Sequence, residues 1–267
     1  MKQLRIGCVK YLNARPLIRG WRGNVEFDHP SALCKRLANG ELDVALVSSF
    51  EFLRNPIYQM VDGVSISSDG PVYSVVVAHR GDFSELEEIE LDPASETAVN
   101  LLRCLLAELN PGARLIQNTD LQPVRPVSSH ARLLIGDQAI GFRQTHTGEF
   151  QFWDLGEQWE KFTRLPFVYA LWLIRPEVAD AKSIAQRLRE LRNENLANID
   201  DVITDTLAGV GDPVQRKELN REFLGCYYRK YLRFGFAEEE RKGLKTFAKL
   251  CAKHGLLEKC DLKFDLL

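Results

Sequence analysis

The sequence predicts an α/β fold with two lobes, mainly parallel sheets and a helical C-terminal tail. The first eighty residues alternate apolar, strand-like runs with short helical patterns, which is typical of parallel strands covered by helices. Two long runs rich in apolar residues, at 72–78 and 167–174, each follow a set of such units. Beyond Pro176 the chain shows only helical patterns, so every strand is expected before that proline.

The first lobe opens with a strand at 4–9 and a second strand at 25–28. Pro30 then favours a helix start, and Gly40 favours a helix end. A short apolar strand at 43–47 follows the helix. The inward positions of that helix, chosen by helical spacing, are Leu33, Cys34, Leu37 and Ala38.

A strand at 60–64 and a polar loop at 65–71 lead into the apolar run at 72–78. The unbroken β-branched and small residues of this run are typical of a strand buried on both faces. We expect it to end the N-terminal part of the first lobe, at 1–80, and to be one of two strands that connect the lobes.

The second lobe is predicted at 81–174, as an insertion into a discontinuous first lobe that resumes at 175–267. It begins with a strand near Ile89 and a helix at 98–109. Two lobes joined in this way hold a ligand in the cleft between them, at the carboxyl ends of the parallel strands. Further strands of the second lobe are expected at 113–116, 133–135 and 152–154.

The composition narrows the classes of function. A formal net charge of -2 gives no excess of cations for a nucleic-acid partner. The first residues lack the apolar stretch of a signal peptide, and we find no run long enough to span a bilayer. We therefore expect a cytoplasmic protein that acts on a small molecule, with neither nucleic acid nor membrane as a partner. Its oligomeric state cannot be inferred from the sequence.

The sequence also predicts that the protein works without a metal or other cofactor. Its five histidines have no metal-ligand spacing, and no glycine-rich phosphate-binding loop is present. The cysteines lack C-x-x-C spacing, so we interpret them as reduced, mostly structural thiols. They are Cys8, Cys34, Cys104, Cys226, Cys251 and Cys260.

Six short blocks, in a fixed order between residues 5 and 168, place polar side chains at the ends of predicted strands. They read RIGCVKYLNARPL at 5–17, DVALVSSFEFL at 43–53, SDGPVYSV at 68–75, LDPASETAV at 91–99, LLIGD at 133–137, and DLGEQW at 154–159 with LPFV at 165–168. Together they resemble the chorismate dehydratase family of the futalosine route to menaquinone.

The resemblance implies a type II periplasmic-binding-protein-like fold and a lyase that removes water from chorismate to give 3-[(1-carboxyvinyl)oxy]benzoate. The sequence departs from the family pattern at Glu96, where a basic residue is common, and at Ala14, where the family has Thr. Two alternatives stay open. The chain could bind a carboxylate without transforming it, or it could be the sister dihydroxynaphthoate synthase or a related lyase.

Asn13 and Ser74 are the candidate catalytic residues. The Asn13 amide could donate a hydrogen bond to the leaving or enolising oxygen and accept one in return. Ser74 would face the cleft if Val75 and Val77 face the core. The alternatives are a loop asparagine that satisfies its own turn and a strand hydroxyl that is satisfied locally. No strong base stands out in these blocks. We therefore hypothesise that a carboxylate accepts the ring proton, and this carboxylate could belong to the protein or to the substrate itself.

The remaining candidates would bind the substrate. Two strand-to-helix junctions, one in each lobe, carry hydroxyl groups, and each junction could bind one of the two carboxylates of the substrate. Ser95 could equally be a helix N-cap. Tyr11 and Arg15 could line the site. Alternatively, Arg15 could lie at the surface with its charged group in solvent, which is common for arginine. Asp137 could orient the ligand, act as a weak base or cap a helix. The hydroxyl candidates are Ser48, Ser49, Ser68, Ser95 and Thr97.

Overall fold

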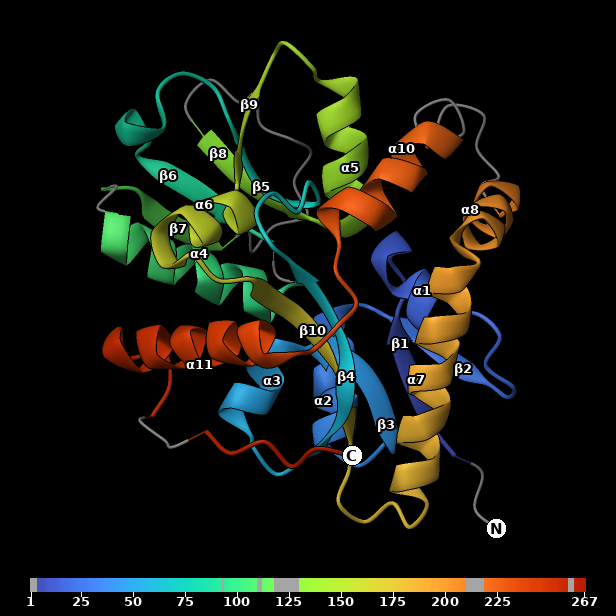
Figure 1. The fold of residues 1–267 in the computed structure, drawn as a ribbon. Coiled ribbons are helices and arrows are strands. Elements are labelled where there is room, and N and C mark those ends of the chain that lie inside the picture. The colour runs from blue at the N-terminus through green and yellow to red at the C-terminus, as the bar shows by residue number, and fades with distance from the viewer. Residues whose placement is uncertain (1–3, 93, 110–111, 118–129, 210–218, 259–261) are drawn as a thin grey trace.

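The protein is built on two five-stranded sheets, one for each lobe (Figure 1). The computed structural model describes residues 4–92, 94–109, 112–117, 130–209, 219–258 and 262–267. The strand order is β2-β1-β3-β10-β4 in the first sheet and β7-β6-β8-β5-β9 in the second. The predicted α/β class is therefore confirmed.

The first sheet has four strands that run in one direction and one that runs against them. β1 pairs in parallel with β2 and β3, whereas β10 is antiparallel to both of its neighbours, β3 and β4. The parallel strands thus end at the same edge of the sheet, and β10 begins there. The bounds are Ile6–Val9 for β1, Val25–Asp28 for β2, Val44–Ser48 for β3, Gln59–Ser68 for β4 and Phe167–Ile174 for β10.

The second sheet repeats this plan. β6 pairs in parallel with β7 and β8, and β5 is antiparallel to β8 and β9. In each sheet the opposed strand is the one that the chain enters after leaving the other lobe, so β5 and β10 both start at the cleft. The bounds are Val75–His79 for β5, Glu88–Leu91 for β6, Arg114–Gln117 for β7, His130–Ile135 for β8 and Gln151–Asp154 for β9.

This pairing corrects the expected placement of the two connecting strands. We expected 72–78 in the first lobe and 167–174 in the second. β5 instead pairs only with strands of the second sheet among the described residues, and β10 lies between two strands of the first. A long apolar run shows that a strand is buried, but it does not show in which sheet. By strand pairing, the chain crosses between the sheets at 69–74 and at 155–166.

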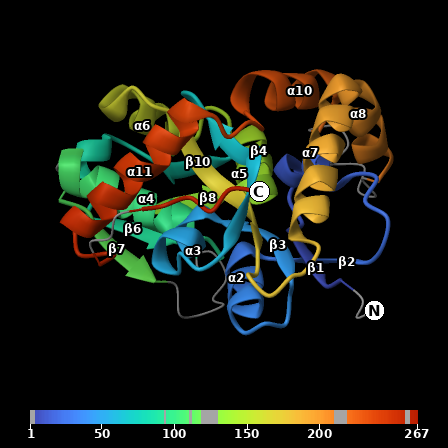
Figure 2. The same ribbon diagram turned by 60° about the horizontal axis from the view of Figure 1, so that its bottom comes forward.

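Helices cover both sheets. On the first lobe, α7 packs against α1 and β4, and α8 packs against α1. The last helix, α11, contacts β10 of the first sheet and α4 of the second lobe (Figure 2). The helices are α1 (Arg15–Ile18), α2 (Pro30–Ala38), α3 (Ser49–Arg54), α4 (Glu96–Leu109), α5 (Gly136–Thr145), α6 (Leu155–Thr163), α7 (Ala181–Ala197), α8 (Ile199–Ala208), α10 (Arg221–Cys226) and α11 (Glu238–Lys253).

Some local predictions are wrong. The polar segment predicted as a loop at 65–71 continues β4 as far as Ser68, because its serines find partners in the sheet and in the C-terminal tail. Ser67, for example, exchanges backbone hydrogen bonds with Arg233. In α2, Leu33, Cys34 and Leu37 are buried as expected, but Ala38 is exposed at the end of the helix.

The described cysteines are free thiols, as predicted, while Cys260 lies outside the described residues. Helices of the length and apolarity needed to cross a membrane are absent from the part of the chain that the structure describes.

Candidate active site

A cavity opens where strand ends of both sheets meet. It contains about 560 Å³ of empty space, including space open to solvent, and the described residues that line it are all uncharged. Asn13, Ser48 and Tyr169 reach it from the first lobe, and Ser74 and Thr97 from the second. The site is therefore a neutral pocket of amide and hydroxyl groups on an apolar background.

Asn13 lies in a short 3₁₀ turn, η1 (Leu12–Ala14), that follows β1. Its Oδ1 atom is buried and accepts no hydrogen bond from the residues that the structure describes. A buried polar atom without a partner carries a free-energy cost that a ligand can remove. The Asn13 side chain is thus available to a ligand in the cavity and does not satisfy its own turn.

The backbone next to Asn13 is fixed from two sides. The Leu12 N–H donates to Asp137 Oδ1 of the second lobe at 2.9 Å, and the Tyr228 hydroxyl donates to the Leu12 carbonyl at 3.0 Å. Gly136 gives the Tyr11 ring room here, because a Cβ atom at Gly136 would lie 2.9 Å from that ring. Its φ of +57° also lies in the left-handed region that favours glycine.

Ser74 is fully buried and directly precedes β5. The Tyr227 hydroxyl donates to Ser74 Oγ at 2.8 Å, and the Ser74 carbonyl accepts from the Gly136 N–H, also at 2.8 Å. The hydroxyl of Ser74 has the Val72 carbonyl oxygen 3.5 Å away, which is long for a hydrogen bond. As expected, Val75 and Val77 belong to the main hydrophobic core.

The loop that delivers Ser74 is held in an uncommon conformation. Tyr73 has a φ of +67°, which is rare for a residue with a side chain. The buried carboxylate of Asp154 accepts from the Val72 N–H at 3.0 Å and from the Tyr73 N–H at 2.8 Å. Asp154 also caps α6, and burial raises the pKa of its carboxyl group. One carboxylate therefore positions both the loop and the start of a helix.

Hydroxyl groups meet directly between the lobes. Ser48, at the end of β3, hydrogen-bonds through its hydroxyl to that of Thr97 in the first turn of α4. Ser95 lines the cavity and also caps α4 by accepting from the Ala98 N–H at 3.1 Å, so the two roles weighed for it coexist geometrically. Ser49 is turned toward the first sheet, where it donates to the Val168 carbonyl at 2.7 Å.

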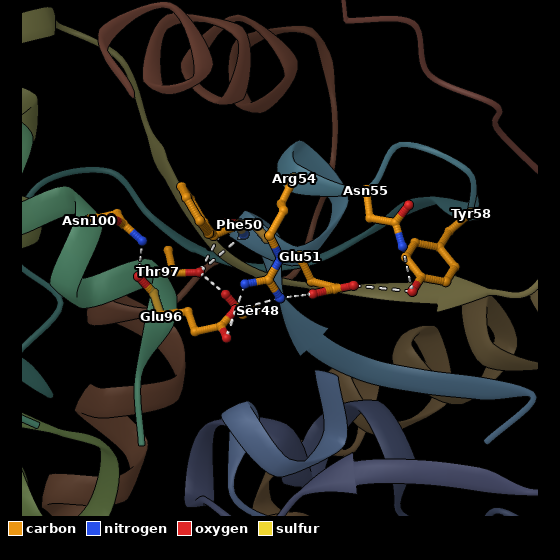
Figure 3. Close-up of polar contacts among 10 residues, drawn as sticks. Ser48, Phe50, Glu51, Arg54, Asn55, Tyr58, Glu96, Thr97 and Asn100 are labelled. Atoms are coloured by element: carbon orange, nitrogen blue, oxygen red, sulfur yellow. Dashed lines mark hydrogen bonds and ion pairs between the residues drawn. The ribbon is translucent and has the colours of Figure 1, made fainter. Parts of the chain in front are cut away.

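A charged network lies beside these hydroxyls (Figure 3). Arg54 of α3 pairs with Glu51 in its own helix and with Glu96 of α4, whose Oε2 lies 3.1 Å from Arg54 Nη2. Tyr58 donates to Glu51 at 3.1 Å. Cys34, Glu51 and Glu96 bring potential metal ligands within 4.8 Å of one another, but the Arg54 guanidinium already pairs with both carboxylates. We call Glu51, Arg54, Glu96 and Tyr58 the rim network.

The structure brings six of the ten predicted site residues to the cavity. These are Tyr11, Asn13, Ser48, Ser74, Ser95 and Thr97. Arg15 instead lines a neighbouring cavity, and Ser68 donates to the Gly70 carbonyl at 3.1 Å. Asp137 holds the backbone of the Asn13 turn. Burial raises the pKa of Asp137 to about 6.

Sequence reasoning gave no site role to several residues that the structure places here. Tyr169 of β10 lines the cavity, and its hydroxyl lies 3.3 Å from Ser68 Oγ. Asp154 was part of a recognised block, and its position at the end of a strand was the available signal. Tyr227 and Tyr228 come from the helical tail, where the helical pattern alone does not distinguish them from other core aromatics.

Comparison with known proteins fits this architecture. A protein of Candida albicans with the generic periplasmic binding protein fold superposes with a TM-score of 0.64, at 14% identity, over 98% of this chain and 92% of its own. A chorismate dehydratase of Thermus thermophilus is 30% identical over 93% of this chain and 95% of its own. One from Campylobacter jejuni is 24% identical over 90% of each.

The structural likeness confirms the predicted periplasmic-binding-protein-like fold. A family model described as menaquinone biosynthesis matches residues 4–253, which include both sheets and all the residues of the candidate active site. The chain thus belongs to the menaquinone biosynthesis family.

Proposed function

We propose that this protein is a cytoplasmic chorismate dehydratase, a hydro-lyase that converts chorismate to 3-[(1-carboxyvinyl)oxy]benzoate and water without a cofactor. The observation that carries the proposal is Asn13 Oδ1, which has no partner among the described residues and lies in a cavity whose described lining is uncharged and includes Ser74. The sequence relationship to two chorismate dehydratases supports it. Because the reaction produces an aromatic ring, it needs mainly orientation, a proton acceptor and help for the departing oxygen.

The elimination removes the ring hydroxyl and a proton from the neighbouring ring carbon. The C–H electron pair becomes the new ring double bond as the C–O bond breaks. The oxygen leaves as hydroxide, and it becomes water by taking back the proton that the base removed from the ring carbon. In our proposal the Asn13 amide donates to the oxygen of the ring hydroxyl and accepts from its hydrogen in return, and the Ser74 hydroxyl also donates to this oxygen as negative charge develops on it. Donors that are already oriented stabilise this charge without having to reorganise during the reaction.

The proton acceptor is assigned to the substrate. The described cavity lining contains no carboxylate or histidine, so a carboxylate of chorismate itself is the base that the geometry favours. The substrate's carboxylates would be received by the Ser48 and Thr97 hydroxyls and by the N-terminal end of α4. The direct contact between Ser48 and Thr97 would then open to admit a carboxylate.

The test is to incubate the purified protein with chorismate and to follow the ultraviolet spectrum, with mass spectrometry to identify a product lighter by one water. We expect an aromatic product, and the same rate after dialysis against EDTA. A thermal shift on adding chorismate, without any product, would favour a binding protein of this fold. Turnover of cyclic dehypoxanthinyl futalosine, but not of chorismate, would favour the sister synthase.

A further inference from the structure

Two consecutive tyrosines in the C-terminal tail reach the candidate catalytic residues: Tyr227 contacts Ser74, and Tyr228 contacts Leu12, the residue before Asn13. Tyr227 and Tyr228 open a π-helical turn, η3 (Tyr227–Tyr231), which follows α10 and is closed by a hydrogen bond of 3.1 Å from the Leu232 N–H to the Tyr227 carbonyl. Such turns are rare and often occur at functional sites. Both tyrosine side chains are buried, with 0% and 3% of their surface exposed.

Tyr227 determines what the Ser74 hydroxyl can do. Because the phenol donates to Ser74 Oγ at 2.8 Å, the hydrogen of Ser74 must point elsewhere. Its protein alternative is the Val72 carbonyl oxygen at 3.5 Å, a poor acceptor at that distance. The Ser74 hydrogen is therefore free to be donated into the cavity. Burial raises the pKa of Tyr227 far above its usual range, so the phenol remains a neutral donor.

Tyr228 acts on the other half of the site. Its hydroxyl donates to the Leu12 carbonyl at 3.0 Å, on the peptide unit that leads directly into Asn13. Asp137 accepts from the Leu12 N–H at 2.9 Å, so the peptide groups before and after Leu12 are both anchored. A backbone fixed at both ends of one residue limits the directions that the next side chain can take.

We propose that Tyr227 and Tyr228 are positioning residues, Tyr227 for the hydroxyl of Ser74 and Tyr228, through the Leu12 backbone, for the amide of Asn13. The inference rests on the proposed function for its kinetic readout. It gives the helical tail a direct part in the reaction, although the strands that form the cavity all precede Pro176. Each tyrosine serves one catalytic residue, which makes the two assignments separately testable.

The first experiment replaces each tyrosine by phenylalanine, which removes one hydroxyl and keeps the ring. For both Tyr227→Phe and Tyr228→Phe we expect kcat for chorismate to fall about tenfold while KM changes less than about threefold, since each lost hydrogen bond acts on groups that function in the transition state. Tyr58→Phe is the matched control, because this tyrosine is equally buried and donates to Glu51 in the rim network. Its kcat should stay within about twofold of wild type.

The decisive experiment is a pair of double-mutant cycles measured in single-turnover assays. Tyr227→Phe should have no further effect in a Ser74→Ala background, and Tyr228→Phe should have none in an Asn13→Ala background. The crossed pairs, Tyr227→Phe with Asn13→Ala and Tyr228→Phe with Ser74→Ala, should multiply their separate effects.

Three results would overturn the inference. One is an undiminished effect of either tyrosine substitution after its own partner has been removed. The second is equal coupling in the crossed pairs, which would mean that η3 supports the fold without selecting a residue. The third is a fall in kcat for Tyr58→Phe as large as for the other two. A wild type that binds chorismate without turnover would overturn only the proposed function. The same cycles would then be measured on the dissociation constant for chorismate, where each tyrosine substitution should have an effect below about threefold that disappears when its own partner has been removed.

Discussion

The cavity and the rim network both join the two lobes, but they use opposite chemistry. In the cavity, Asn13 and Ser74 are neutral, and at least one polar atom, Asn13 Oδ1, has no partner among the described residues. In the rim network, Arg54 is paired with Glu51 from its own lobe and with Glu96 from the other. Ser48 and Thr97 line the cavity, and their contact also lies beside the rim network (Figure 3), so the two regions do not differ in location.

We interpret the rim network as a set of ion pairs that hold the lobes together, and the cavity groups as polar groups that are available to bind a ligand. Removing one partner of a buried ion pair lowers the free energy of unfolding, because the remaining charge is left buried without a partner. Truncation of Asn13 should cost little stability, since its Oδ1 atom has no hydrogen bond to lose among the described residues. We therefore expect substitutions in the cavity to change turnover and substitutions in the rim network to change stability.

Asn13→Ala should give the largest effect. We expect chorismate turnover to fall by about 10²- to 10³-fold, the size found when one oriented donor to a charge-developing oxygen is removed. The melting temperature should stay within about 2 °C of wild type, because Oδ1 of Asn13 makes no hydrogen bond to the described protein. Steady-state kinetics and calorimetry measure the two quantities. Retention of more than about a third of the turnover, or loss of turnover through unfolding, would contradict the assignment.

Arg54→Met should show the opposite pattern. Glu51 is 1% exposed and would keep only the Tyr58 hydroxyl among the partners described above, so we expect the free energy of unfolding to fall by about 2 kcal/mol. The value of kcat should change less than about threefold. Urea denaturation measures the first quantity and the chorismate assay the second.

Arg187→Met is the control for Arg54→Met. Arg187 pairs with Glu190 and Glu194 on the surface of α7, so its loss should lower the free energy of unfolding much less than the loss of Arg54 does. Adding Glu51→Gln to Arg54→Met should recover part of the lost stability, since no buried charge is then left unpaired. Equal costs for Arg54→Met and Arg187→Met would show that the rim network does not stabilise the fold.

The fold was largely predictable because apolar runs mark strands even when the sheet they join is unknown. The runs at β5 and β10 were both recognised, but their partners lie far away in the sequence, and strand pairing reversed their expected lobes. The serines at the end of β4 were predicted as a loop because their hydrogen-bond partners also lie far away in the sequence. The partner of Ser67 is the backbone of Arg233, 166 residues further along the chain.

The site was predictable where a loop follows a strand and not where a contact returns from the tail. Asn13 follows β1 and Ser48 is the last residue of β3. The carboxyl ends of these two strands meet at the cleft, so the topology alone brings the two residues together. The contact between Tyr227 and Ser74 spans 153 residues and depends on a π-helical turn, which a helical pattern does not reveal. Arg15 was misplaced because the turn after Asn13 directs it to the neighbouring cavity.

Asp137→Asn tests a residue that joins the two patterns, since this carboxylate anchors the Asn13 turn yet is itself largely buried. Its pKa is raised from 3.8 to about 6, chiefly by burial, so folding favours its protonated form. Protonation of Asp137 therefore contributes stability to the folded protein below about pH 4, and this stability is lost as the pH rises through about 6. Asparagine keeps an oxygen that can accept from the Leu12 N–H without the buried charge.

We therefore expect Asp137→Asn to raise the free energy of unfolding by about 1 kcal/mol at pH 7.5, and the gain to disappear near pH 4. Urea denaturation of both proteins across this range measures the difference. A gain that is independent of pH would show that Asp137 does not titrate in this window.

Glu96→Gln should give the smallest effect and sharpens the comparison within the rim network itself. Glu96 is 22% exposed on its side chain and shares Arg54 with Glu51, which stays paired after the substitution. We expect a loss of about 0.5 kcal/mol in stability at low ionic strength, and almost none in 1 M NaCl, because salt screens a partly exposed pair. Since the Arg54–Glu96 pair joins α3 of the first lobe to α4 of the second, KM for chorismate should rise by about twofold or less while kcat stays unchanged.

Denaturation and kinetics at both salt concentrations measure the effects of Glu96→Gln. A fall in the free energy of unfolding as large as that of Arg54→Met would mean that Arg54 stabilises the protein mainly through Glu96, between the lobes, and less through Glu51.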